Sequence, residues 1–83
     1  MKRGSKLLEA ARTRPANLRF EELLALARAA GFEESRQRGS HHVLRRPGLP
    51  GRMVFQPRPD GKAKVYQVRQ LLEAIERLGI GLE

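Results

Sequence analysis

The segment from Gly39 to Gly48 reads GSHHVLRRPG, and it breaks the helical pattern that both ends of the chain carry. Its centre is a short run with a β-branched residue, and residues typical of turns (Gly, Ser and Pro) enclose it. A similar run follows at Met53–Gln56, and a polar run precedes it at Phe32–Arg38. These runs and the turns between them predict a three-stranded antiparallel sheet, with its middle strand at His41–Arg46.

Apolar residues at helical spacing predict a helix on each side of this sheet. The helix before it, Phe20–Ala30, places five apolar side chains on one face, and Gly31 stops it. The helix after it, Val65–Leu78, carries a similar stripe and ends before Gly79. A shorter helix at Gly4–Arg14 is expected either to pack on the edge of the domain or to form a frayed arm.

Eighty-three residues allow one domain with a thin core. The order α-α-β-β-β-α indicates an α+β fold, with both main helices on one face of the sheet and the other face open to solvent. We expect residues 1–16 to form an N-terminal helical extension and residues 17–83 to form the single domain. No run approaches the roughly 18 apolar residues of a membrane span, and no apolar run follows the basic start, so we expect a cytoplasmic protein without a signal peptide.

The formal net charge is +8, and most of it lies in the middle of the chain. Residues 35–64 hold eight Lys and Arg against one Asp, a net +7, whereas residues 1–34 carry +2 and residues 65–83 carry −1. A charge concentrated in this way is typical of a protein that binds polyanions. We therefore expect nucleic acid as the partner, bound to the solvent face of the sheet, rather than a membrane surface or an acidic protein.

Both histidines of the chain are adjacent, at His41 and His42, and there is no cysteine. Neighbouring residues of a strand point to opposite faces, so the two rings cannot easily bind one metal ion, and we expect no metal site. General acid–base chemistry fits better, because imidazole exchanges protons near neutral pH and nearby cations can stabilise phosphoryl charge. If the bound nucleic acid is RNA, only one of the two rings can face it. Alternation along the strand does not decide which ring this is, because Val43 and Leu44 are both apolar and lie on opposite faces, so either face could be the inner one.

The stretch from Phe20 to Ile80 resembles the HicA (YcfA-like) toxin family. Its carrying features are Glu22-Leu23, Gly31-Phe32, Gly39-Ser40-His41-His42-Val43, Arg45-Arg46-Pro47, Val68, Arg69, Leu72 and Gly79-Ile80. The resemblance implies a double-stranded-RNA-binding-domain-like fold, cleavage of mRNA without a metal or other cofactor, and neutralisation by a HicB-type antitoxin. Family members have their single catalytic histidine at the fourth position of a Gly-Ser-x-His motif, which in this chain is His42.

The leading hypothesis is therefore an mRNA-cleaving endoribonuclease toxin, with His42 as general base on the outer face of the sheet. Ser40 and His41 are candidates for supporting roles, and the proton for the leaving oxygen is left open between His41, an Arg and water. Six residues are expected to contact RNA: Arg36, Arg38, Arg45, Arg46, Lys62 and Lys64. One alternative is a non-catalytic RNA-binding module of the same fold, which does not need His42. Another is an antitoxin-like or ribosome-associated protein that uses its charge only for solubility and docking.

Overall fold

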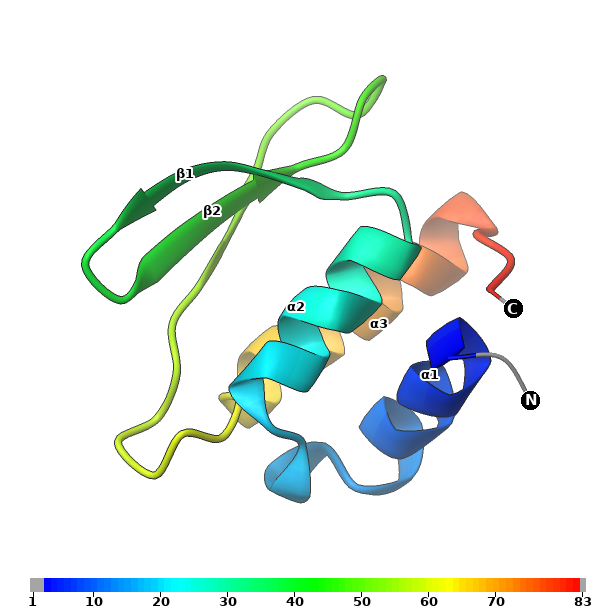
Figure 1. Cartoon of the computed structure of the whole chain (residues 1–83). Coiled ribbons are helices and arrows are strands. Elements are labelled where there is room, and N and C mark those ends of the chain that lie inside the picture. The colour runs from blue at the N-terminus through cyan, green and yellow to red at the C-terminus, as the bar shows by residue number, and fades with distance from the viewer. Residues whose placement is uncertain (1–2, 83) are drawn as a thin grey trace.

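The computed structural model describes residues 3–82 and has the expected order of elements, with one added turn of 3-10 helix (Figure 1). In chain order the elements are α1 (Arg3–Thr13), the 3-10 helix η1 (Pro15–Asn17), α2 (Phe20–Ala29), β1 (Glu33–Arg38), β2 (His41–Arg45), β3 (Met53–Phe55) and α3 (Val65–Leu78). The α+β prediction is confirmed. Met1 and Lys2 of the expected extension, and Glu83 of the expected domain, lie outside the described residues.

The three strands form one antiparallel sheet in the order β1-β2-β3, as predicted. From the tight turn that joins β1 to β2, the pairing is regular as far as Arg36 opposite Val43. It then slips by one residue, so that Glu34 and not Ser35 lies opposite Leu44. The slip is a β-bulge, in which the Ser35 hydroxyl donates a hydrogen bond to the Val43 carbonyl at 3.4 Å.

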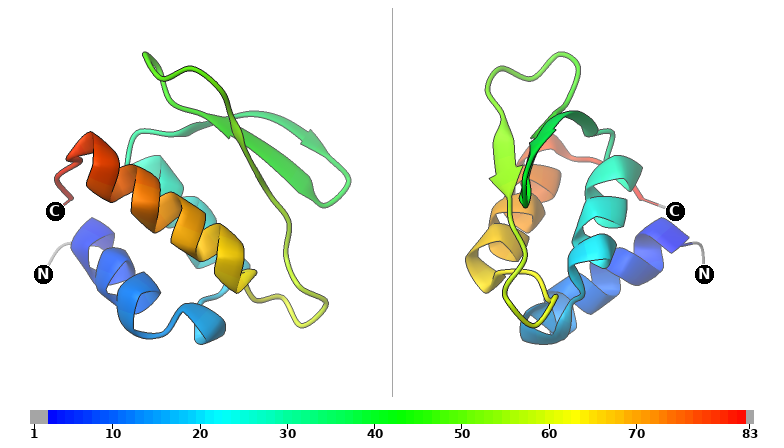
Figure 2. Two further views of the ribbon diagram at one scale, coloured as in Figure 1. Left: turned by 180° about the vertical axis from the view of Figure 1, so that it is seen from behind. Right: turned by 60° about the vertical axis from the view of Figure 1, so that its left-hand side comes forward.

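Helices α2 and α3 cover one face of the sheet, and no other described element covers the opposite face (Figure 2). Helix α1 packs against both helices on the side away from the sheet (Figures 1 and 2). Helix α2 is therefore buried on two sides, and Leu26, which lies off the predicted stripe, is as buried as Leu23 on it. Because Leu7 and Ala11 of α1 belong to the core, the packed helix is confirmed over the frayed arm.

The strand boundaries differ from the prediction by one residue at three ends. Strand β1 begins after Phe32, because Phe32 turns into the core and its N–H donates to the Ala27 carbonyl at the end of α2. Strand β2 ends one residue earlier than predicted, at Arg45. Strand β3 ends before Gln56, whose N–H donates to the side chain of Gln67 in α3 instead of to β2. None of the described helices is both long and apolar enough to cross a membrane.

Candidate active site and nucleic-acid interface

His42 lies on the face of the sheet that packs against the helices, so the prediction of a ring on the outer face is wrong. It precedes the buried Leu44 by two residues, and alternation turns both side chains to the same side. Its ring packs against that of Phe20 at the start of α2, with the ring centroids 5.1 Å apart. The side chain of His42 remains 15% exposed, because it stands at the turn-side end of β2.

Glu34 holds one nitrogen of the His42 ring. The Oε1 atom of Glu34 lies 2.8 Å from Nδ1 of His42. Because an ionised carboxylate can only accept a hydrogen bond, this contact favours the ring form that carries its proton on Nδ1. In the neutral ring the other nitrogen, Nε2, is then the basic position, which is the form that a general base requires.

The contact between Glu34 and His42 depends on the bulge in β1. With the same turn and no bulge, Ser35 would lie opposite Leu44, and Glu34 would lie opposite Arg45 on the outer face. The extra residue shifts the phase of the strand, which brings Glu34 to the helix-facing side. The bulge thus assembles a carboxylate–imidazole pair that a regular hairpin would separate.

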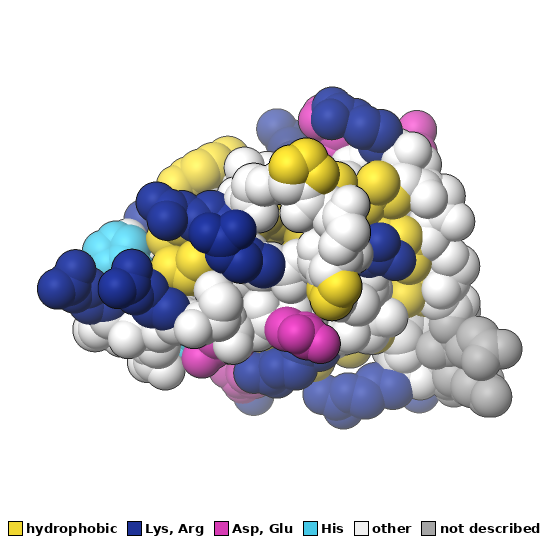
Figure 3. Space-filling model, turned by 90° about the horizontal axis from the view of Figure 1, so that it is seen from above, with side chains coloured by type: hydrophobic (Ala, Val, Ile, Leu, Met, Phe, Trp, Pro, Cys, Tyr) yellow, Lys and Arg dark blue, Asp and Glu magenta, His cyan; other side chains and the backbone are white. Residues whose placement is uncertain are grey.

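The outer face of the sheet carries three of the predicted RNA-binding residues. Arg38 pairs with His41 across the hairpin, and alternation places Arg36 and Arg45 on the same face, opposite to His42. The three arginines are exposed, and none of them makes a side-chain hydrogen bond or ion pair with another described residue. In Figure 3, dark-blue Lys and Arg side chains gather beside a cyan histidine and yellow apolar groups. We call Arg36, Arg38 and Arg45 the outer cationic surface.

Arg46 does not belong to this surface. Its Nε donates a hydrogen bond to the carbonyl oxygen of Ala30 at 2.9 Å, and its guanidinium lies close to Gly31. Ala30 directly follows α2 as its C-cap residue, and carbonyls at a helix C-terminus lack partners within the helix, so the Arg46 side chain helps to cap this end. Any RNA contact by Arg46 has to compete with this bond.

Lys62 and Lys64 lie in the loop between β3 and α3 and are not part of the strands that form the outer cationic surface. The Lys62 ammonium donates to a side-chain amide oxygen of η1 at 3.3 Å, and the Lys64 ammonium donates to Gln56 Oε1 at 3.4 Å. Gln56 in turn donates to the Ser40 hydroxyl at 3.2 Å. Ser40 therefore links the turn before β2 to this loop, and no hydrogen bond joins it to the ring of His42.

Asp60 is the single acidic residue of the basic segment 35–64, and it pairs with an arginine of the same loop. Arg58 forms an ion pair with Asp60, with Nη2 and Oδ2 2.8 Å apart. This hydrogen bond, followed by one from the backbone N–H of Lys62, holds the pKa of Asp60 below its ordinary value. The pairing removes Arg58 from the free cations of the segment. Among residues 3–82, no three His, Asp or Glu side chains gather in a way that could hold a metal ion.

Residues 20–80 match the family model described as HicA toxin of bacterial toxin–antitoxin systems. The matched segment spans α2, the whole sheet and α3, with the Glu34–His42 pair and the outer cationic surface inside it. The chain belongs to the HicA toxin family. Membership makes it the toxin of a toxin–antitoxin pair and implies a cognate antitoxin and an RNA target. No curated protein and no solved structure matches the chain, so a double-stranded-RNA-binding-domain-like fold stays a prediction.

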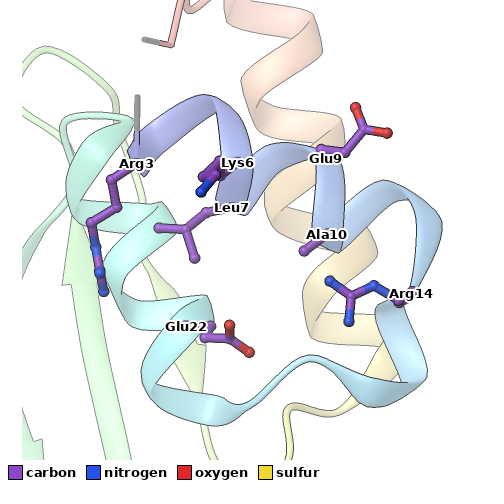
Figure 4. Close-up of a pocket in the computed structure, with 7 residues that line it drawn as sticks. All are labelled: Arg3, Lys6, Leu7, Glu9, Ala10, Arg14 and Glu22. Carbon is purple, nitrogen blue, oxygen red and sulfur yellow. The ribbon is translucent and has the colours of Figure 1, made fainter. Parts of the chain in front are cut away.

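Helix α1 lies outside the HicA match, yet it contributes to the same core. Together with α2 it encloses a hollow of about 450 Å³ on the side of α2 away from the sheet (Figure 4). The hollow is lined by Arg3, Lys6, Leu7, Glu9, Ala10, Arg14 and Glu22. Its charges are mixed in sign and it does not adjoin His42, so we do not assign it to the HicA activity.

Sequence reasoning missed two features of this HicA chain. Glu34 was not among the site residues expected from the sequence. The predicted hairpin places it on the neighbouring strand, but only the bulge decides which face it occupies. Arg46 was grouped with Arg45 as an RNA contact, although the alternation that separates His41 from His42 also separates these two arginines.

Proposed function

We propose that this HicA chain is an endoribonuclease that cleaves RNA without a metal ion, with His42 as its general base. The observation that carries the proposal is the set of contacts that the His42 ring makes. Its Nδ1 is held by Glu34, its ring packs at a tilt against that of Phe20, and the side chain stays partly exposed, which leaves Nε2 for a substrate. His41 makes no side-chain hydrogen bond or ion pair with the described residues. The resemblance to HicA toxins supports the same choice, because it implies a catalytic histidine at the fourth position of the Gly-Ser-x-His motif.

The proposed reaction uses the 2′-hydroxyl of the RNA as nucleophile. Nε2 of His42 takes the proton of this hydroxyl, and the oxygen attacks the adjacent phosphorus. The bond from phosphorus to the 5′ oxygen breaks, and the leaving oxygen takes a proton from water. The products are a 2′,3′-cyclic phosphate and a 5′-hydroxyl. We assign the last proton to water because His41 lies on the opposite face of the sheet from His42.

We propose that the RNA backbone follows the free edge of β1. Because β1 is an edge strand, one strand spacing of about 4.8 Å separates His42 from that edge. From the other face, the long side chains of Arg36 and Arg38 can reach phosphates of the same backbone and stabilise their charge. In this arrangement, side chains from both faces of the β1–β2 hairpin contact one RNA chain.

A non-catalytic RNA-binding module is the second candidate, and the packing of His42 favours it. A ring in contact with Phe20 and hydrogen-bonded to Glu34 is also what a purely structural histidine would show. The outer cationic surface by itself would suffice to bind phosphates without sequence preference. The two candidate functions therefore predict different effects of removing His42: the endoribonuclease would lose cleavage, whereas the binding module would lose no activity.

The discriminating experiment compares His42→Ala with His41→Ala as the matched control. A defined RNA is incubated in EDTA, fragment ends are analysed, and RNA affinity and urea unfolding are measured for each protein. We expect His42→Ala to lower the cleavage rate by about 10²–10⁴ with little change in RNA affinity, and His41→Ala to stay close to the wild type. Cleavage that persists in His42→Ala, or that the chelator abolishes, would contradict the mechanism. RNA binding without cleavage by the wild type would favour the module.

We further propose that a HicB-type antitoxin neutralises the toxin by covering the hairpin end that carries His42. The basic hairpin requires an acidic contacting surface on this partner, which speeds association and makes the complex sensitive to salt. A complex that leaves His42 open to solvent would argue against this mode of neutralisation.

A further inference from the structure

We infer that Glu34 is the positioning residue of the His42 general base. In this role it fixes the orientation and the tautomer of the ring without touching the RNA. The inference rests on the proposed function of His42. It adds a second residue that cleavage needs, on the neighbouring strand and outside the Gly-Ser-x-His motif.

The hydrogen bond decides which nitrogen of the ring can act as a base. A neutral imidazole carries its proton on one of its two nitrogens, and only the form protonated on Nδ1 offers a free electron pair on Nε2. The Glu34 carboxylate, 2.8 Å from Nδ1, stabilises that form and also the imidazolium produced when Nε2 takes a proton. The ring of Phe20, tilted at 57° to the imidazole, restrains it further.

The surroundings of Glu34 suit a positioning role. Its side chain is 28% exposed and its side-chain partner is His42, so the carboxylate is neither buried for packing nor shared with an arginine. It reaches the helix-facing side only through the bulge. Glu33, the preceding residue of β1, lies on the outer face opposite Arg45 and is exposed. Two adjacent glutamates thus differ mainly in whether they meet His42.

The test compares Glu34→Gln with Glu33→Gln, which removes the same charge from the same strand. A glutamine can donate to Nδ1 and so favour the form protonated on Nε2, which cannot act as a base. For Glu34→Gln we expect kcat to fall by about 10²–10³. This is less than the roughly 10⁴ found when an amide replaces the carboxylate behind a buried catalytic histidine. KM for RNA should change no more than in Glu33→Gln. Glu34→Asp, which keeps the carboxylate, should recover part of the loss.

Nitrogen NMR of the full chain without RNA supplies a readout independent of turnover. In the wild type, neutral His42 should be protonated on Nδ1. In Glu34→Gln a large share should move to the form protonated on Nε2, while Glu33→Gln should keep the wild-type pattern. If Glu34→Gln cleaves as fast as Glu33→Gln while His42→Ala is inactive, the inference is wrong and the proposed function stands. If His42→Ala still cleaves, both fall. A wild-type ring protonated on Nε2 would also overturn the inference.

Discussion

Arg45 and Arg46 are adjacent in sequence, and the structure assigns them opposite tasks, so a pair of alanine substitutions should separate stability from RNA binding. Arg46→Ala removes the charged donor from the buried Ala30 carbonyl. Hydrogen bonds to charged groups contribute about 1.5–3 kcal/mol, and the lower part of that range applies here because Arg46 is only half-buried. A loss of about 1.5–2 kcal/mol should lower Tm by roughly 6–15 °C in a domain of this size. Arg45→Ala removes an exposed, unpaired side chain and should change stability by less than about 0.5 kcal/mol.

The two variants should show the opposite pattern when RNA binding is measured, with an effect in Arg45→Ala and none in Arg46→Ala. Thermal unfolding followed by circular dichroism gives Tm, and fluorescence anisotropy at several salt concentrations gives the slope of log Kd against log salt. If Arg45 contacts one phosphate, Arg45→Ala should flatten the slope by about 0.7, whereas Arg46→Ala should leave it unchanged. A stable Arg46→Ala protein with a flattened slope would refute the cap assignment and restore Arg46 to the RNA-binding residues.

Four further predictions concern other parts of the molecule. Gln67→Leu should cost about 2 kcal/mol or more in urea unfolding, because the buried amide pairs a carbonyl of β3 and the N–H that follows the strand; an unchanged midpoint would contradict this. Leu7→Ala should cost about 2–4 kcal/mol, since α1 belongs to the core, and a negligible cost would show the helix to be dispensable. If the RNA extends from the free edge of β1 to the loop before α3, replacing Lys62 and Lys64 by Ala should flatten the salt slope by about 0.7 for each phosphate that these side chains neutralise, and an unchanged slope would confine the RNA to the β1 edge. Replacing Arg36, Arg38 and Arg45 by Ala, with the helix cap Arg46 left in place, should weaken the antitoxin complex, as measured by its dissociation at rising salt.

The order and type of the elements could be predicted because the apolar period changes along the chain. Helices Phe20–Ala30 and Val65–Leu78 have continuous stripes, and the strands between them lie among residues typical of turns. Three strand ends were misplaced by one residue, because tertiary contacts decide where a strand stops. At Phe32 such a contact is a hydrogen bond to the end of α2, and at Gln56 it is one to α3.

The geometry of the site could not be predicted in the same way. Val43 and Leu44 are both apolar, so periodicity cannot tell which of them faces the helices, and the face of His42 follows from that choice. The partner of His42 depends on a bulge whose residue, Ser35, has no sequence signature of its own. A count of charges also cannot show which cations are already engaged. The net +7 of the middle segment already subtracts Asp60, the partner of Arg58, but it still includes Arg46, which is bound to a helix end, so it overstates the free positive charge.

The bulge in β1 also gives a counting rule for reading related sequences. In this chain the acidic residue that meets the histidine precedes it by eight positions, because Ser35 takes up one position without a partner on β2. In a relative whose hairpin has the same turn but regular pairing, the same contact needs the acidic residue seven positions before the histidine. An alignment that fixes the histidine and allows no gap in the preceding strand would then set the two carboxylates in different columns. The acidic partner of the histidine would then look unconserved, although both chains have it. Allowing a gap of one residue in the strand would align the two carboxylates.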